Sequence, residues 1–134
     1  MPDRVSTAAS AVVLIVEDEA LLRELAVEFV EDAGFVALEA GDAEQAIALL
    51  EARSDIAVLF TDINMRGSMD GLELARAVHD RWPPVRIIVA SGQVRPKPAD
   101  LPQDGVFLEK PYRGEALVAR LRSLAGCIEL QVQT

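Results

Sequence analysis

The stretch "VLFTDINM", residues 58–65, places an apolar run directly against a carboxylate, Asp62. The same pattern occurs earlier in the chain, where "VVLIVEDE", residues 12–19, runs from apolar residues into Glu17 and Asp18. Continuous apolar runs rich in β-branched residues are typical of strands that are buried on both faces of a parallel sheet. Two such strands that end on acidic residues predict a polar site at their carboxyl ends.

Strand patterns and helical patterns alternate along the rest of the chain. Capping signals at Asp42 and Asp70 precede two of the segments with helical spacing, and Gly34 stands where the C-cap of another is expected. The alternation predicts right-handed βαβ crossovers and a doubly wound parallel sheet, which is an α/β fold. The predicted strands cover residues 12–16, 35–39, 56–60, 85–91 and 105–110, and the predicted helices cover 20–33, a segment after Asp42, 70–81 and a segment from Arg113.

Two stretches do not fit this alternation. The stretch "VRPKPADLP", residues 94–102, has three prolines where the fourth helix is expected, so that helix should be short or distorted. The stretch "CIELQVQT", residues 127–134, alternates apolar and polar residues with the period of a strand. We therefore expect a domain over residues 11–125, preceded by a loose tail at 1–10. The extension at 126–134 would form an edge strand, a partner-binding strand or a frayed end.

The composition restricts the classes of partner. With 13 basic and 22 acidic residues the net charge is −9, which argues against nucleic acid because a phosphate backbone needs a basic face. The single cysteine, Cys127, leaves no disulfide within the chain, and no apolar stretch reaches the roughly 20 residues of a membrane span. We expect a soluble cytoplasmic protein with neither a nucleic-acid nor a membrane partner.

Further polar residues follow the fourth and fifth predicted strands. In open α/β sheets ligands bind beyond the carboxyl ends of the strands, so Ser91 and Lys110 should join Glu17, Asp18 and Asp62 at one edge. Carboxylates held together repel, and a divalent cation relieves this; ligands that are all oxygen favour Mg²⁺ or Mn²⁺. Lys110 could neutralise phosphoryl oxygens, Ser91 could donate a hydrogen bond to one, and Asp62 could act as a nucleophile that forms an acyl phosphate.

Taken together, these motifs resemble the response-regulator receiver domain of two-component signalling. The resemblance covers residues 11–125 and rests on five motifs that occur in the order typical of the family. The family fold is a doubly wound, five-stranded parallel sheet with the flavodoxin-like strand order 2-1-3-4-5, and we expect this order here. The motifs are "ED" at 17–18, "TDINM" around Asp62, "MDGLEL" at 69–74, "VASG" at 89–92 and "KPY" at 110–112.

The resemblance implies a phosphoacceptor and a metal site. Asp62 would accept a phosphoryl group from the phosphohistidine of a histidine kinase or a phosphotransfer protein. Glu17, Asp18 and Asp62 would hold Mg²⁺, and the backbone carbonyl of Asn64 would be a further ligand.

The resemblance also implies a switch. Ser91 would move toward the phosphate, Lys110 would bridge to it, and Phe107 occupies the position of the family's switch aromatic residue. The Lys110–Pro111 peptide bond would be cis. The chain departs from the family pattern at Arg66, where a proline is usual, so this residue could loosen the turn or contact the phosphate.

These expectations describe a stand-alone receiver whose phosphorylation changes its affinity for a downstream protein that the sequence does not identify. It would be a signalling module that catalyses only its own phosphorylation and dephosphorylation. One alternative is an intermediate phosphate carrier or sink in a relay, and another is a scaffold that works without phosphate. The alternative of another class is a magnesium-dependent phosphohydrolase that uses an aspartyl-phosphate. Such an enzyme normally needs a second acid two residues after the nucleophile, where this chain has Asn64.

Overall fold

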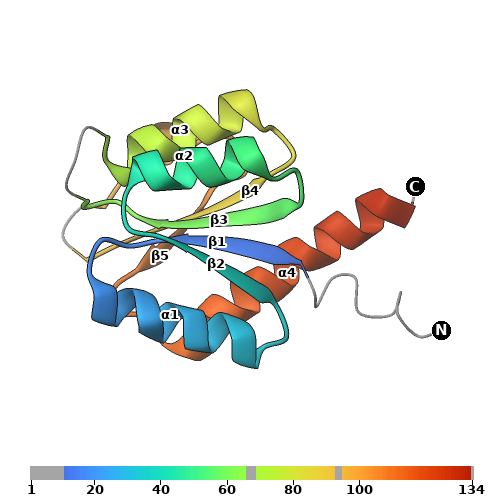
Figure 1. Cartoon of the computed structure of the whole chain (residues 1–134), viewed down its shortest axis with the longest axis horizontal. Coiled ribbons are helices and arrows are strands. Elements are labelled where there is room, and N and C mark those ends of the chain that lie inside the picture. Colours follow the sequence, from blue (N-terminus) through green and yellow to red (C-terminus); the bar gives the residue numbers. More distant parts are fainter. Residues whose placement is uncertain (1–10, 66–68, 93–94, 134) are drawn as a thin grey trace.

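The computed structural model describes residues 11–65, 69–92 and 95–133. Its five strands form one parallel sheet with the order β2-β1-β3-β4-β5 (Figure 1), so the predicted doubly wound α/β fold and its strand order are confirmed. The strands are β1 Val12–Val16, β2 Val36–Ala40, β3 Ile56–Asp62, β4 Arg86–Ser91 and β5 Val106–Glu109. The helices are α1 Ala20–Asp32, α2 Ala43–Ala52, α3 Gly71–Arg81 and α4 Gly114–Gln133, with a short 3₁₀ helix, η2, at Pro98–Asp100.

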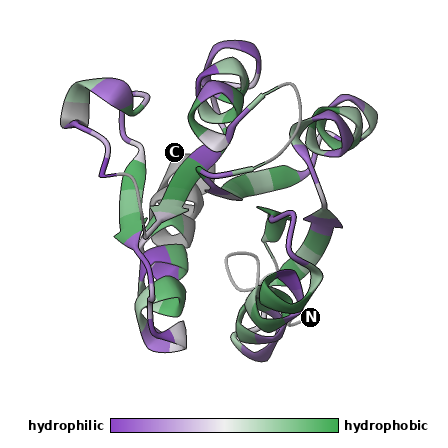
Figure 2. Cartoon of the chain, turned by 90° about the vertical axis from the view of Figure 1, so that its left-hand side faces the viewer, coloured by the Kyte–Doolittle hydropathy of each residue, from purple (hydrophilic) through white to green (hydrophobic). Residues whose placement is uncertain are grey.

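The sheet separates two apolar cores. Helices α2 and α3 cover one face and helices α1 and α4 cover the other (Figure 1). Successive residues of a strand point to opposite faces, so Leu14 and Leu59 pack in the α2–α3 core while Ile15 and Phe60 pack in the α1–α4 core. Seen from the carboxyl ends of the strands, the sheet is mainly hydrophobic between helices that carry hydrophilic segments (Figure 2). This double burial explains why the strand sequences are continuously apolar.

Helix α1 ends in a Schellman motif that turns the chain into β2. The N–H of Phe35 donates to the carbonyl of Val30 at 3.2 Å, and the N–H of Gly34 donates to the carbonyl of Glu31 at 3.0 Å. Gly34 has a φ of 97°, a left-handed conformation that costs glycine little because it has no Cβ. The predicted C-terminal glycine signal is confirmed.

The capping signals of α2 and α3 are both formed, but in different ways. The Asp70 side chain accepts the N–H of Glu73 and the Glu73 side chain accepts the N–H of Asp70, which is a complete capping box. At α2 the Asp42 side chain accepts the N–H of Gln45, whereas the Gln45 side chain accepts the N–H of Gly41 instead of that of Asp42. Both helices therefore begin where the sequence predicts.

The connection between β4 and β5 contains no α-helix in the part of it that the structure describes. Only η2 forms there, which confirms the expected short or distorted fourth helix. Proline has no N–H to donate, so the three prolines of this stretch cannot complete a helical hydrogen-bond ladder. Arg76 of α3 donates to the carbonyl of Asp100 at 2.9 Å and so ties η2 to α3.

The C-terminal stretch corrects one expectation. Residues 127–133 continue helix α4, so the strand that the alternating pattern suggested is wrong. The last turns of α4 extend away from the sheet, and none of the five described strands lies beside them (Figure 1). A strand needs a paired edge, whereas each residue added to an existing helix gains a hydrogen bond within the same segment. None of the described helices combines the length and the apolar character needed to cross a bilayer.

Candidate functional site

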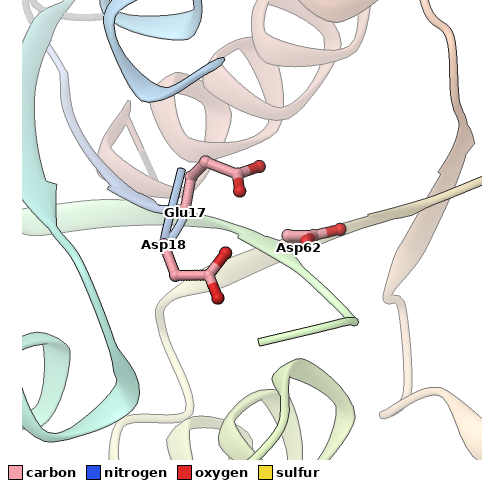
Figure 3. A group of neighbouring side chains, drawn as sticks. All are labelled: Glu17, Asp18 and Asp62. Carbon is pink, nitrogen blue, oxygen red and sulfur yellow. The ribbon is translucent and has the colours of Figure 1, made fainter. Parts of the chain in front are cut away.

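Three acidic side chains meet at the carboxyl ends of two adjacent central strands. Glu17 and Asp18 follow β1 and Asp62 ends β3, and the two strands pair in register at Val16 and Thr61. Each residue offers a carboxylate oxygen, and these oxygens all lie within 4.8 Å of one another (Figure 3). The structure therefore brings together the three residues that the sequence predicted to share a metal site.

Burial makes this acidic cluster electrostatically unfavourable. Glu17 is 7% exposed and Asp62 is 8% exposed. Burial raises the pKa of the Glu17 carboxyl above its ordinary value, and the charge of Asp62 raises it further. Burial also raises the pKa of Asp62, and the charge of Asp18 adds to this. In both cases Lys110 works in the opposite direction without reversing the shift.

Lys110 places an ammonium group between two of the carboxylates. Its Nζ lies 3.1 Å from Oδ1 of Asp62 and 3.2 Å from Oε1 of Glu17. Burial acts to lower the pKa of Lys110, but the attraction of Asp62 and Glu17 outweighs it, so the pKa is raised and the side chain stays charged. The Lys110–Pro111 peptide bond is cis, as the resemblance implied.

The donor set of the cluster fits a hard divalent cation. One ammonium group offsets only part of the charge of three carboxylates, so a surplus of negative charge remains at the edge of the sheet. All three side chains offer oxygen, which is the ligand that Mg²⁺ and Mn²⁺ prefer in proteins. A cation that keeps some of its waters could also contact a phosphate there.

Ser91 and Asn64 lie at the carboxyl ends of two neighbouring strands, β4 and β3. Ser91 ends β4 and is 1% exposed. The side-chain amide of Asn64 donates to its hydroxyl at 3.5 Å, and its carbonyl accepts the N–H of Lys110 at 3.0 Å. The Ser91 hydroxyl therefore contacts a residue that follows β3, and the Ser91 backbone contacts the residue that follows β5. The role of the Asn64 carbonyl as a ligand stays a prediction.

Phe107 lies within β5, pairs in register with Val89 and is half-buried against the α2–α3 core. Its role as a switch residue stays a prediction. Arg66 lies outside the residues that the structure describes.

Two residues that shape the site were missed by the sequence analysis. Gly71, the first residue of α3, lies so close to β3 that an added Cβ would meet the carbonyl oxygen of Asp62 at 1.9 Å. Arg23 of α1 donates from Nη1 to the carbonyl of Glu17 at 2.7 Å. Gly71 belongs to the quoted "MDGLEL" motif, which was the signal available for it, whereas nothing in the local sequence around Arg23 indicates its contact.

An open pocket with a volume of about 540 Å³ adjoins the acidic cluster. Its α1 wall is apolar, and three leucines of α1 are unusually exposed: Leu21 at 69%, Leu22 at 38% and Leu25 at 43%. An exposed apolar cluster of this kind is typical of a surface that another protein covers. The pocket is lined by Glu17, Leu22, Leu25, Phe29, Gly92, Lys110, Pro111 and Tyr112.

Comparison with known proteins points to one family. Residues 13–122 match the family model described as the response regulator receiver domain. The chain is 34% identical over 110 residues to the nitrogen assimilation regulatory protein NtrX of Azorhizobium caulinodans, covering 79% of this chain and 24% of that protein. It is 32% identical over 114 residues to the transcriptional regulatory protein CpxR of Escherichia coli K12, covering 84% of this chain and 48% of that protein. The chain thus spans about a quarter of the length of the first relative and about half of the length of the second.

Solved structures agree with the family match. A response regulator receiver protein from Sinorhizobium medicae superposes with a TM-score of 0.81 at 27% identity, covering 87% of this chain and 95% of that one. A CheY-like receiver domain protein from Methanospirillum hungatei gives a TM-score of 0.75 at 28% identity, covering 88% and 96%. With the family model matching most of its length, the chain belongs to the response-regulator receiver domain family.

Proposed function

We propose that this receiver accepts a phosphoryl group on Asp62 from a histidine kinase or a phosphotransfer protein, in a reaction that depends on Mg²⁺. One observation carries the proposal: the Asp62 carboxylate lies 3.1 Å from the Lys110 ammonium and shares an acidic cluster with Glu17 and Asp18. The arrangement supplies a nucleophile, a cation site and a fixed positive charge at one point.

The cation would be held by Glu17, Asp18 and Asp62, with the Asn64 backbone carbonyl as a further ligand. Mg²⁺ is the expected ion, and Mn²⁺ has the same preference for oxygen. When bound, it would supply positive charge that stabilises the oxygens of the transferring phosphoryl group. It would also relieve the repulsion between the carboxylates, which adds to the effect of burial in raising the pKa of Asp62 and Glu17.

The chemical step would use the ionised form of Asp62. A carboxylate oxygen attacks the phosphorus of the phosphohistidine, and the new O–P bond of the acyl phosphate forms as the P–N bond breaks. The imidazole leaves with the electron pair of that bond. Lys110 neutralises a phosphoryl oxygen, and the Ser91 hydroxyl donates to another after it turns from Asn64.

The exposed leucines of α1 support a protein as the phosphodonor. Leu21, Leu22 and Leu25 lie on the helix that begins next to the acidic cluster, and two of them line the adjoining pocket. A donor protein that covers them would bring its phosphohistidine to Asp62. Phosphorylation would then reorient Ser91 and Phe107 and change the affinity of this receiver for a downstream protein in the cytoplasm.

The direct test is incubation with acetyl phosphate or phosphoramidate and Mg²⁺, followed by intact mass measurement. We expect one added phosphoryl group on the wild-type chain and none after chelation of the cation. The Asp62→Ala variant should take up none, and persistent labelling of that variant would refute the assignment of Asp62.

A hydrolytic activity is less well supported by the same geometry. Two residues after Asp62 the chain has Asn64, whose amide donates to Ser91 and has no carboxyl proton to give to a leaving group. We therefore expect no steady turnover of a generic phosphomonoester such as p-nitrophenyl phosphate. Sustained release of phenolate would favour the phosphohydrolase instead.

A further inference from the structure

The turn after β1 is held by hydrogen bonds to the backbone and the side chain of Glu17. The N–H of Glu17 donates to the carbonyl of Ala40 in β2 at 3.1 Å. The carbonyl of Glu17, in the peptide unit that joins Glu17 to Asp18, accepts a hydrogen bond from Nη1 of Arg23 at 2.7 Å. The N–H of Glu19 also donates to Oε2 of Glu17 at 3.2 Å. These three hydrogen bonds fix the direction in which the chain leaves β1.

Arg23 is itself held in position by two elements. Its backbone N–H donates to the carbonyl of Glu19 at 2.9 Å, within the first turn of α1. Its Nε lies 3.2 Å from Oε1 of Glu39 in β2, and the Arg23 side chain is 23% exposed. One guanidinium group therefore links α1, β2 and the turn after β1. Because the guanidinium is planar with fixed donor directions, it can orient a carbonyl more strictly than an ammonium can.

We propose that Arg23 is a positioning residue for the divalent cation. It would fix the carbonyl between the two acidic residues and, through that peptide plane, the directions of the Glu17 and Asp18 carboxylates. Groups that orient metal ligands without touching the metal commonly affect affinity by about tenfold or more. The inference rests on the proposed cation site at Glu17, Asp18 and Asp62.

Charge and positioning predict opposite results when Arg23 is replaced. Arg23 adds a positive charge near an acidic cluster, so charge alone predicts that its removal would strengthen the binding of a cation. If Arg23 orients the ligands, its removal would weaken that binding. Arg23→Lys keeps the charge but loses the planar group, so charge alone predicts no change for this variant and positioning predicts weaker binding.

The experiment measures Mn²⁺ binding to the full chain from the electron paramagnetic resonance signal of the free ion, with Mg²⁺ as competitor. We expect Arg23→Met to weaken binding about tenfold and Arg23→Lys to weaken it by a smaller factor. Arg53→Met is the control with the same charge loss, because Arg53 is exposed and pairs with Asp55 away from the site. It should bind Mn²⁺ like the wild type.

A second readout separates positioning from a general loss of structure. With acetyl phosphate as donor, the Mg²⁺ concentration for half-maximal phosphorylation should rise in Arg23→Met while the rate at saturating Mg²⁺ stays near that of the wild type. If the wild-type chain binds Mn²⁺ and both Arg23 variants bind it as tightly or more tightly, the inference about Arg23 is wrong, whereas the proposed cation site stands. Failure of the wild-type chain to bind Mn²⁺ would overturn the proposed cation site as well.

Discussion

Charged side chains are buried and unbalanced at one end of the sheet, and exposed and paired at the other. At the carboxyl ends of the strands, Glu17 and Asp62 are buried with one ammonium group, Lys110, between them. At the other end, where β3 and β4 begin, exposed arginines pair one to one with exposed acids. Arg53 lies 2.8 Å from Asp55, and Arg81 lies 2.8 Å from Glu51.

The difference agrees with the placement of the proposed site at the carboxyl ends of the strands. Exposed and balanced ion pairs are screened by water and contribute little to stability, so their sequence can vary without consequence for the fold. Buried carboxylates in excess cost stability, since burial and mutual repulsion disfavour their charged forms. Such buried clusters of titratable groups are typical of functional sites. In this protein we expect a cation and a phosphoryl group to bind beside the carboxylates.

The largest effect is expected at the carboxyl-terminal end from Lys110→Met. The variant removes the ammonium that lies 3.1 Å from the Asp62 oxygen, so phosphorylation by acetyl phosphate should slow by about 10² to 10³. Intact mass measured against time gives the rate. The Arg53→Met variant removes the same charge at the opposite end and should react like the wild type; similar losses in both would show that net charge, not geometry, controls the reaction.

Gly71→Ala should be the most destabilising of the substitutions at this end. Its new Cβ would meet the backbone carbonyl oxygen of Asp62 at 1.9 Å, and a backbone atom cannot turn aside as a side chain can. We expect a loss of about 1 to 3 kcal/mol in the free energy of unfolding, measured with urea.

Gly41→Ala is the matched control for Gly71→Ala. At Gly41 a Cβ would meet only the ends of flexible side chains at 3.5 Å, so the variant should lose much less. Equal losses in the two variants would contradict the steric explanation.

The pH dependence of stability should reveal the buried acids. The pKa of Asp62 in the folded state is raised above its ordinary 3.8, and that of Glu17 above its ordinary 4.5. The folded state therefore binds protons more tightly than the unfolded state, so stability falls as the pH rises from these ordinary values through the raised ones. Lys110 stays charged throughout this range and adds no slope there.

Urea unfolding between acid and neutral pH, with a chelator present, would measure this slope. In Asp62→Asn the part of the slope due to Asp62 should vanish, and the variant should be more stable than the wild type near neutral pH. With saturating Mg²⁺ in place of the chelator the difference should shrink, because the wild type binds the cation with one more carboxylate than the variant does. A wild type whose stability rises over the same interval would show that these carboxyls are not destabilised by burial.

The smallest effect is expected at the opposite end, from Arg53→Gln. The variant breaks an ion pair between two exposed side chains, and such pairs are screened by water and contribute little to stability. Urea unfolding at low and at moderate salt should give nearly the same free energy for the variant and the wild type. A loss as large as that of Gly71→Ala would remove the contrast between the two ends of the sheet.

The sequence predicted the parts of this fold that depend on neighbours along the chain. Apolar runs marked the strands, Asp42 and Asp70 marked two helix starts, and Gly34 marked a helix end. Prolines in residues 94–102 predicted that the helix between β4 and β5 would be short, and a 3₁₀ helix is described there. The alternating pattern in residues 127–134 misled, because whether a period of two becomes a strand depends on a partner edge that lies elsewhere.

The candidate site divides in the same way. Each acid follows its own strand directly, so a parallel topology was enough to predict that Glu17, Asp18 and Asp62 would meet. Parallel strands place their carboxyl ends at one edge whatever the details of packing. The contacts of Arg23 were not predictable, because they join α1 to β2 and to the turn after β1. For Gly71 the "MDGLEL" motif marked the residue, but the close approach of α3 to β3 is a property of the packing.

By itself, then, the sequence determined the order of the elements, the edge of the sheet that carries the acids and the family to which the chain belongs. Tertiary structure alone decided how deeply those acids are buried, where the ammonium of Lys110 rests between them and which arginine holds the turn after β1. The physical reason is the distance along the chain over which each kind of interaction acts. Periodicity and capping act over a few residues, whereas burial, charge balance and close backbone approach arise only when distant segments pack together.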